Sequence, residues 1–489
     1  MTPMSVRART RLQEVEVQAL DAARLESLIG SERIARFEMV AEVAQSVLAG
    51  HSVLNVNSTA TGGGVAEMLQ TLLAYVRGAG VDARWLVIEG DPEFFAITKR
   101  IHNGLYGSPG DGGELGQAER ARYERVLARN AEELLTLVKP GDVVVIHDPQ
   151  PAGLVQTVKD AGARVLWRCH VGVDEPNPWT ERAWEFLHPY LLEADAYVVS
   201  RAAFAPPWAD ASNLHVIPPS IDPFSAKNEP MSHRNVRIVL SYVGLLDGDG
   251  SPPFVPFIRR DGSPGRINRH VDVVQSGPAV PAKAPLVIQA SRWDWMKDMA
   301  DVMAGFAAHV DPALGAHLIL AGPAVTGVAD DPEAAQVYDD CVERWRRLPH
   351  AICGRVHLAC VPMTDPDEAA AIVNALQRHA SVVVQKSIAE GFGLTVAEAM
   401  WKSRPIVGSA VGGIQDQIAD GVEGLLIEDP HDLEALGSRI EWLLTKPGEA
   451  ARLGANARTK ATDEFLATGT SSSTGACSPT ARCAYSEAE

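Results

Sequence analysis

The sequence predicts an α/β fold built from two doubly wound parallel sheets, and three observations lead to this prediction. Short apolar runs that suit buried strands alternate with helical stretches, for example at 51–57 and 381–384. Each of these two runs leads into a glycine-rich turn that opens a helix. The chain has 489 residues, of which 46% are hydrophobic and 22% charged, so it can form two or three domains, each with its own core.

A stretch rich in proline and glycine divides the chain. Residues 1–245 are predicted to form a first domain that begins with amphipathic helices, and residues 246–284 to form a linker with the hinge. Residues 285–466 are predicted to form the second domain. Residues 467–489 are rich in Ser, Thr and Gly, so we expect an atypical, disordered tail, and we interpret it as the product of a frameshift.

Composition excludes several classes of function. The net charge of -18 argues against sequence-independent nucleic-acid binding, which needs many Lys and Arg side chains. No signal peptide and no apolar run of about 18 residues stands out, so we expect a cytoplasmic protein without membrane contact. Six cysteines lack CxxC spacing, which indicates reduced thiols without a zinc site: Cys169, Cys341, Cys353, Cys360, Cys477 and Cys483.

The turn after residues 381–384 is a candidate anion site. Gly391 and Gly393 permit positive φ or close approach of the backbone, and the unpaired amides that open the next helix, from about Leu394, suit a phosphate. Glu390 and Glu398 can reach opposite ends of one elongated ligand. The structural alternative is an ordinary turn with an acidic residue near the start of a helix.

A basic pair follows the next candidate strand, residues 285–290. Arg292 and Lys297 are five residues apart after the strand end, so both can converge on one diphosphate, the guanidinium as a fork and the ammonium as a point charge. A solvated loop is the structural alternative.

Two segments of the first domain also follow strand ends. The triple glycine Gly62, Gly63 and Gly64 opens a helix after residues 51–57, and His170 follows the strand 164–167 with Asp174 close behind. Taken alone, the glycines indicate a tight connection, and a histidine at a strand end is more often structural than functional.

Together these motifs resemble the retaining nucleotide-sugar glycosyltransferases of the GT-B class, family four. The resemblance is carried by Glu-x7-Glu around Gly-Phe-Gly-Leu and by Ser-Arg-x-Asp-x-x-Lys-Asp. It implies two Rossmann-like domains with an interdomain cleft. It also implies that Arg292 and Lys297 hold the donor diphosphate, Glu390 the hexose and Glu398 the ribose, with further donor contacts from Gly391, Phe392, Gly393, Leu394 and Thr395.

A narrower resemblance is to trehalose synthases of the glycosyltransferring type and to trehalose phosphorylases. It rests on Arg-x-His followed by Glu-Pro-Asn, and on Pro-Pro-Ser-Ile-Asp-Pro at 218–223. It implies acceptor contacts from Gly62, Gly63, Gly64, His170 and Asp174, and a catalytic set of Glu390, Arg292, Lys297 and His170. Gly172 and Val173 replace the residue pair that this family usually carries, which leaves the contacts of this loop open.

The resemblance implies a retaining transfer that forms trehalose reversibly from ADP-glucose or UDP-glucose and glucose. A phosphate-dependent trehalose phosphorylase and a non-catalytic sugar- or nucleotide-binding protein are the alternatives. We expect small-molecule partners only, with no cofactor and no required metal, because no Asp-x-Asp motif stands out. The nucleotide base and the oligomeric state, for which a homodimer is one option, are not readable from the sequence.

Overall fold

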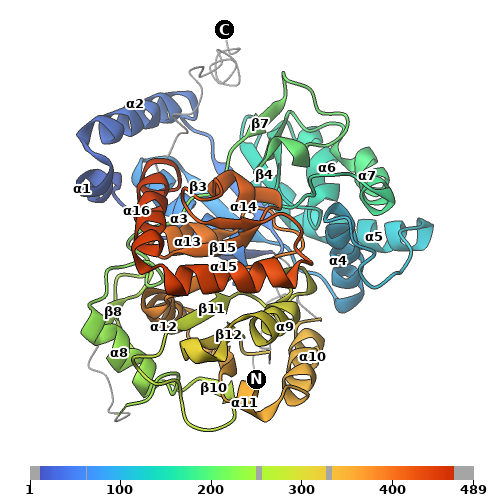
Figure 1. Ribbon diagram of the computed structural model, residues 1–489. Coiled ribbons are helices and arrows are strands. Elements are labelled where there is room, and N and C mark those ends of the chain that lie inside the picture. The colour runs from blue at the N-terminus through green and yellow to red at the C-terminus, as the bar shows by residue number, and fades with distance from the viewer. Residues whose placement is uncertain (1–11, 62, 249–255, 326–332, 467–489) are drawn as a thin grey trace, which may run out of the picture. The chain divides into compact units, whose positions relative to one another are not determined.

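The computed structural model describes residues 12–61, 63–248, 256–325 and 333–466 (Figure 1). The chain divides between Pro218 and Pro219 into two compact units, each of which contains a seven-stranded sheet with helices around it. This confirms the predicted α/β class with two sheets of Rossmann-like type.

The sheet of the first unit has the order β1-β3-β2-β4-β5-β6-β7, in which β1 is antiparallel to β3 and the other pairs are parallel. Its strands are β1 (Gln13–Val15), β2 (Val53–Asn57), β3 (Ala83–Val87), β4 (Val143–His147), β5 (Arg164–Cys169), β6 (Ala196–Val199) and β7 (Leu214–Val216). Its α-helices are α1 (Glu26–Ile29), α2 (Ser31–Val47), α3 (Gly64–Gly78), α4 (Pro92–Leu105), α5 (Gln117–Leu137), α6 (Val155–Asp160) and α7 (Pro178–Leu191).

Side chains along the strands point alternately to the two faces of the sheet, so the first unit has two hydrophobic cores. Leu54 and Val56 of β2 pack in one core with residues of α4, α5 and α7, whereas Trp85 of β3 packs in the other with Leu69 and Leu73 of α3. Because successive side chains point to opposite faces, both faces of the sheet are buried.

The sheet of the second unit has the order β10-β13-β12-β11-β14-β15-β16, again parallel except at one edge. Its strands are β10 (Asp272–Val274), β11 (Leu286–Ala290), β12 (His317–Pro323), β13 (Val356–Val361), β14 (Val382–Gln385), β15 (Ile406–Ser409) and β16 (Leu425–Ile427), and β8 (Pro256–Ile258) pairs separately with β9 (Pro264–Arg266). Its α-helices are α8 (His233–Tyr242), α9 (Met299–His309), α10 (Ala334–Arg346), α11 (His350–Cys353), α12 (Pro366–His379), α13 (Leu394–Trp401), α14 (Gly412–Gln417), α15 (Leu433–Thr445) and α16 (Pro447–Glu464).

Each sheet reverses its strand order once. In the first unit β2 has β3 on one side and β4 on the other, and in the second unit β11 has β12 on one side and β14 on the other. In doubly wound sheets, ligands bind beyond the carboxyl ends of the strands at such a switch point. The strand order therefore indicates where a binding site should lie in each unit.

The structure differs from the predicted domain boundaries. Residues 219–245 belong to the second unit: α8 packs against α12, and Nδ2 of Asn374 donates to the carbonyl oxygens of Ala226 and Glu229 at 3.1 and 3.0 Å. The predicted linker 246–284 contains the β8-β9 hairpin and the antiparallel edge strand β10. Three-residue strands are too short to show a hydrophobic period, which is why β1 and β10 were not predicted.

Three predictions concern the cysteines, the tail and the absence of a membrane-spanning helix. The thiols of Cys169, Cys341, Cys353 and Cys360 are free and buried, as expected. Cys477, Cys483 and the predicted tail 467–489 lie outside the described residues. Among the described helices, none has the length and apolar character needed to cross a bilayer.

The position of residues 219–245 leads to a first prediction. Asn374→Leu should lower the free energy of unfolding by about 2 kcal/mol, because the carbonyl group of the buried Ala226 loses its donor from Asn374 while the number of side-chain heavy atoms is kept. Urea unfolding followed by tryptophan fluorescence measures this, with Asn268→Leu as the control because Asn268 is exposed. Equal stability of the two variants would contradict the packing described for Asn374.

Candidate functional site

The switch point of the second unit brings together the two charged motifs predicted from the sequence. Nζ of Lys297, after β11, lies 2.6 Å from Oε2 of Glu390, after β14. The same oxygen accepts from Oγ of Ser387 at 3.1 Å and from Nε2 of Gln385 at 3.4 Å. Glu390 is only 7% exposed. Three neighbouring donors hold its carboxylate in one position.

Arg292 lies in the same loop, which is fixed by its own hydrogen bonds. Asp294 caps the short 3-10 helix Trp295–Lys297, because Oδ1 accepts from the amide of Met296 at 2.8 Å, while Oδ2 lies 3.0 Å from Nη2 of Arg292. The carbonyl of Met296 accepts from the amide of Ile388 at 2.8 Å, which ties this loop to the loop after β14. The side chain of Arg292 is 37% exposed and can reach a ligand.

The glycine-rich turn sits against Glu390. Gly393 has φ 90° and ψ 60°, a left-handed conformation, and a Cβ added there would lie 3.4 Å from Cγ of Glu390. Gly391 and Phe392 are buried, and Leu394 and Thr395, which open α13, are half-buried. No side chain caps α13, so its first amides are positioned to bind an anion beside the pair of Lys297 and Glu390.

Glu398, the predicted ribose ligand, is also in α13 but is buried, at 2% exposure. Its Oε1 lies 3.1 Å from Nζ of Lys227, and its Oε2 is 3.5 Å from Nε2 of Gln377. A buried carboxylate needs such a partner. Lys227 therefore supplies the charge that Glu398 requires in this structure, and ribose binding by Glu398 stays a prediction.

The switch point of the first unit places His170 in a chain of buried polar side chains. Nε2 of His170, after β5, lies 3.2 Å from Nδ1 of His147 at the end of β4, and Nε2 of His147 lies 3.1 Å from Oδ1 of Asn55 in β2. The amide of His170 donates to Oδ1 of Asp148 at 2.8 Å. Of these four residues, only His170 was predicted as a site residue, although the strand order would have indicated the other three.

Burial sets the charge state of these groups. It lowers the pKa of His147 and of His170 well below the usual range, with the nearby Arg168 acting in the same direction. Burial also raises the pKa of Asp148 to about 7, although the amide of His170 and the charge of Arg168 oppose that rise. Both imidazoles are therefore neutral at pH 7.

The other predicted acceptor residues differ in their surroundings. Gly63 has φ 83° and precedes α3, Gly64 is the exposed first residue of α3, and a Cβ at Gly63 would meet nothing within 4 Å. Gly62 lies outside the described residues. Oδ1 of Asp174 is 2.5 Å from Nη1 of Arg201, so this carboxylate already has a cationic partner.

Gly172 departs from the family pattern, and side-chain packing explains why glycine is present at this position. A Cβ at Gly172 would lie 2.3 Å from the ring of the buried Phe204. Glycine is therefore needed here for close packing of the loop that carries His170.

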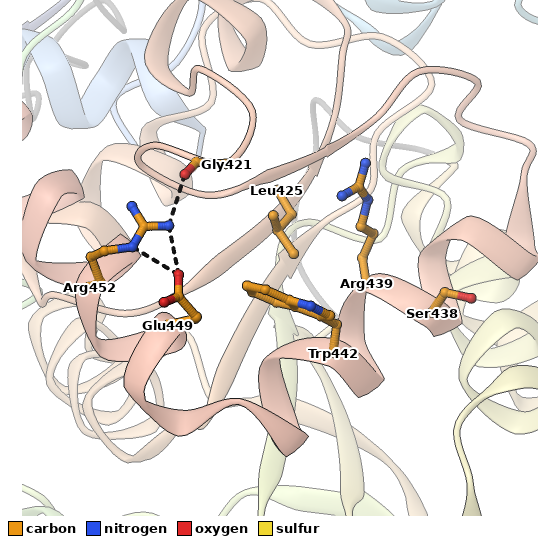
Figure 2. Close-up of a pocket in the computed structure, with 7 residues that line it drawn as sticks. All are labelled: Gly421, Leu425, Ser438, Arg439, Trp442, Glu449 and Arg452. Carbon is orange, nitrogen blue, oxygen red and sulfur yellow. Dashed lines mark hydrogen bonds and ion pairs between the residues drawn. The ribbon is translucent and has the colours of Figure 1, made fainter.

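A cavity of about 530 Å³ lies elsewhere on the second unit, lined by Gly421, Leu425, Ser438, Arg439, Trp442, Glu449 and Arg452 (Figure 2). It lies at the amino end of β16, because Leu425 begins that strand. Nη2 of Arg452 lies 2.8 Å from Glu449, and Nη2 of Arg439 lies 3.5 Å from Asp420. Both guanidinium groups therefore have an anionic partner. The cavity lies at the amino end of a strand, whereas the predicted donor site lies at the carboxyl ends of β11 and β14.

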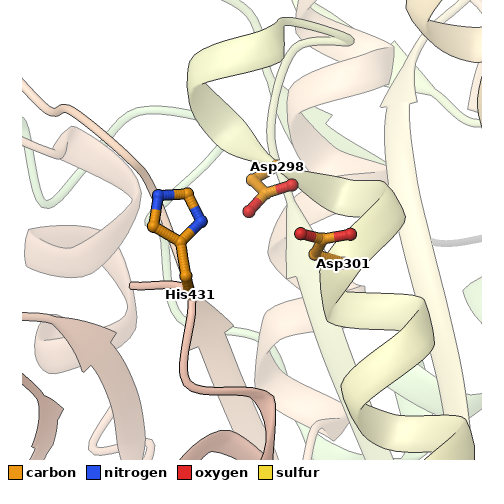
Figure 3. Close-up of side chains that lie close together, drawn as sticks. All are labelled: Asp298, Asp301 and His431. Atoms are coloured by element: carbon orange, nitrogen blue, oxygen red, sulfur yellow. The ribbon is translucent and has the colours of Figure 1, made fainter. Parts of the chain in front are cut away.

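Asp298, Asp301 and His431 lie close enough together to hold a metal ion (Figure 3). Asp298 precedes α9 and Asp301 lies in its first turn, where acidic side chains favour the helix dipole. Oδ2 of Asp298 pairs with the ammonium of the fully buried Lys386. Because the ammonium of Lys386 already pairs with the carboxylate of Asp298, the cluster has a structural explanation that needs no metal ion.

Comparison with known proteins identifies the family. The family "Trehalose synthase, N-terminal domain" matches residues 55–206, and "Glycosyl transferases group 1" matches residues 362–460. The trehalose synthase of Pyrococcus horikoshii is 32% identical over 442 residues, which cover 90% of this chain and 92% of that protein. The chain belongs to the trehalose synthase family. A second member, from Rubrobacter xylanophilus, is 33% identical and covers 88% of this chain and 92% of its own length.

More distant similarities of this trehalose synthase family member concern the fold. The trehalose phosphorylase of Pleurotus pulmonarius is 24% identical, but the match covers only 55% of that protein. Among solved structures, an alpha,alpha-trehalose-phosphate synthase from Burkholderia xenovorans has a TM-score of 0.61 at 14% identity, covering 85% of this chain and 97% of that one. A sucrose-phosphate synthase from Thermosynechococcus elongatus has a TM-score of 0.58 at 18% identity, covering 85% of this chain and 95% of that one. These similarities confirm the GT-B fold class.

The raised pKa of Asp148 gives a second prediction, on pH and stability. Between pH 4 and pH 7 the folded state holds a proton on Asp148 that the unfolded state has lost, so this group lowers the free energy of unfolding as pH rises, by up to about 4 kcal/mol in total. Above pH 7 its effect is constant. Asp148→Asn keeps the oxygen that accepts from His170 but does not titrate.

Urea unfolding of both proteins from pH 4.5 to 8 measures this effect. The wild type should lose stability relative to Asp148→Asn as pH rises to 7, and the difference should then level off. Parallel curves across the whole range would contradict the pKa assigned to Asp148.

Proposed function

We propose that this protein transfers glucose from a nucleoside-diphosphate glucose, ADP-glucose or UDP-glucose, to free glucose, and forms trehalose reversibly with retention. The observation that carries the proposal is the position of Lys297 and Glu390 beside the opening of α13, in a chain that belongs to the trehalose synthase family over nearly all its length. A diphosphate and a hexose would then lie side by side at this switch point.

The donor side of the proposal follows from charge. Arg292, Lys297 and the first amides of α13 are positive groups that suit a diphosphate. In the absence of donor, Glu390 neutralises Lys297. With donor bound, the ammonium contacts the phosphate as well, and the Glu390 carboxylate accepts hydrogen bonds from hexose hydroxyls.

The chemical step breaks the bond between the anomeric carbon and the phosphate oxygen and forms a bond from that carbon to the acceptor hydroxyl oxygen. Arg292, Lys297 and the α13 amides stabilise the charge that develops on the leaving nucleoside diphosphate. In the proposed mechanism a phosphate oxygen takes the proton of the acceptor hydroxyl on the same face of the sugar, so the configuration is retained. His170 would hold the acceptor glucose, and the scheme requires neither a cofactor nor a metal ion.

The products formed in the reverse direction test the function. Purified protein incubated with trehalose and ADP or UDP should yield the nucleoside-diphosphate glucose and glucose, detected by chromatography and mass spectrometry. Glucose 1-phosphate formed with inorganic phosphate instead would assign the protein to the phosphorylases. A protein that binds these sugars or nucleotides without forming either product would be a binding protein, and the proposal would be wrong.

Removal of the ammonium tests the proposed donor site. Lys297→Ala should lower kcat/KM by about 30-fold or more, equivalent to about 2 kcal/mol of transition-state stabilisation, because the leaving diphosphate loses a charged contact. Steady-state kinetics with the active donor measures this, and Lys139→Ala, at an exposed site of the first unit, is the matched control. Turnover of Lys297→Ala near that of the control would refute the assigned role.

A further inference from the structure

The ion pair of Lys227 and Glu398 lies next to the proposed donor site of the second unit. Glu398 is four residues after Leu394, one turn along α13 and about 6 Å along the helix axis from the amides that suit a diphosphate. Helical side chains tilt toward the helix N-terminus, so Glu398 leans toward those amides. In a nucleoside diphosphate the ribose follows the diphosphate directly, which places its hydroxyl groups within reach of this carboxylate.

Lys227 belongs to a segment that is fixed against α12 and α13. The next residue, Asn228, is buried, and its carbonyl oxygen accepts from Nη2 of Arg378 at 2.9 Å and from Nε1 of Trp401 at 3.1 Å. Its Oδ1 accepts from Nζ of Lys402 at 2.8 Å. The backbone that carries Lys227 is therefore held in place relative to the helix that carries Glu398.

The charge on Lys227 answers a requirement of Glu398. The Glu398 side chain is 2% exposed and that of Lys227 21%, with 3.1 Å between Nζ and Oε1, so the pair lies just below the surface. A second amine, Nζ of Lys402, donates to the backbone carbonyl of Glu398 at 3.2 Å. Burial lowers the pKa of Lys402 well below its usual range, although the Glu398 carboxylate opposes this shift. Lys227 is thus the amine that supplies positive charge to a carboxylate that is costly to bury alone.

We propose that Lys227 is a positioning residue, which holds the Glu398 carboxylate ionised and oriented to accept hydrogen bonds from the donor ribose, and thereby sets a preference for ribonucleotides. The inference rests on the proposed function, which supplies the nucleotide. A merely structural ion pair would stabilise the second unit but would have no effect on the choice between ribose and deoxyribose.

Binding of matched nucleotides separates these two roles. Isothermal titration calorimetry gives Kd for ADP and 2′-deoxy-ADP, and for UDP and 2′-deoxy-UDP. The wild type should prefer the ribonucleotide about 10-fold, as for one hydrogen bond to a charged group. Lys227→Met keeps the length of the side chain but removes the charge, so the preference should fall to about 2-fold or less.

Two further variants are controls for this measurement. Lys227→Arg should keep most of the preference, and Lys283→Met, at an exposed position of the second unit, should keep all of it. No preference in the wild type, or an unchanged preference in Lys227→Met, would overturn the inference. Tighter ribonucleotide binding by Lys227→Met would also overturn it, because Lys227 would then block Glu398 instead of positioning it.

A double-mutant cycle tests whether Lys227 acts through Glu398. Glu398→Gln should lose the preference to the same extent as Lys227→Met, and the double variant should lose no more than Glu398→Gln. Losses that add would overturn the inference. If Lys227→Met does not fold because its buried carboxylate lacks a cation, the double variant leaves no charge unpaired, and its comparison with Glu398→Gln still decides.

These measurements also distinguish this inference from the proposed function. A wild-type protein that binds no nucleoside diphosphate would contradict the proposed function and this inference together. A protein that forms nucleoside-diphosphate glucose from trehalose, but has the same ribose preference with and without the Lys227 ammonium, would contradict this inference alone.

Discussion

The reversal of strand order in each parallel sheet is the constraint on which both candidate sites depend. Where two neighbouring strands lead into connections that run in opposite directions, no helix covers their carboxyl ends, and the loops there are left to bind a ligand. In the second unit this occurs between β11 and β14, which carry Lys297 and Glu390 at their ends. In the first unit it occurs between β2 and β4, where Asn55 and His147 meet.

The site in the second unit is built from charges in a nearly closed environment. Lys297 is paired with Glu390, and the fully buried Lys386 with Asp298, so each buried charge has an opposite charge within contact. Such pairs offset the cost of removing ions from water, although the balance is often close to zero. We infer that these pairs hold the two loops after β11 and β14 in one geometry.

The two imidazoles at the candidate site of the first unit are neutral instead. Burial keeps His147 and His170 uncharged by lowering the pKa of each, and it raises the pKa of Asp148 to about 7. Neutral nitrogen acceptors suit sugar hydroxyls, whereas cations suit phosphates. The two units therefore differ in the ligand chemistry of these groups, and the proposed function assigns the acceptor sugar to the first unit and the anionic donor to the second.

The sequence alone was sufficient for the α/β class, for strands that carry the candidate sites and for the motifs around Lys297 and Glu390, because each depends on a local pattern of apolar runs, glycine and charge. It did not determine the short edge strands β1 and β10, the boundary after Pro218 or the partner of Glu398. Asn55 and His147 are 92 residues apart, and so their contact follows only from the strand order. Tertiary structure decided these features because pairing between distant segments, and the burial that sets their charges, leave no periodic signal in the chain.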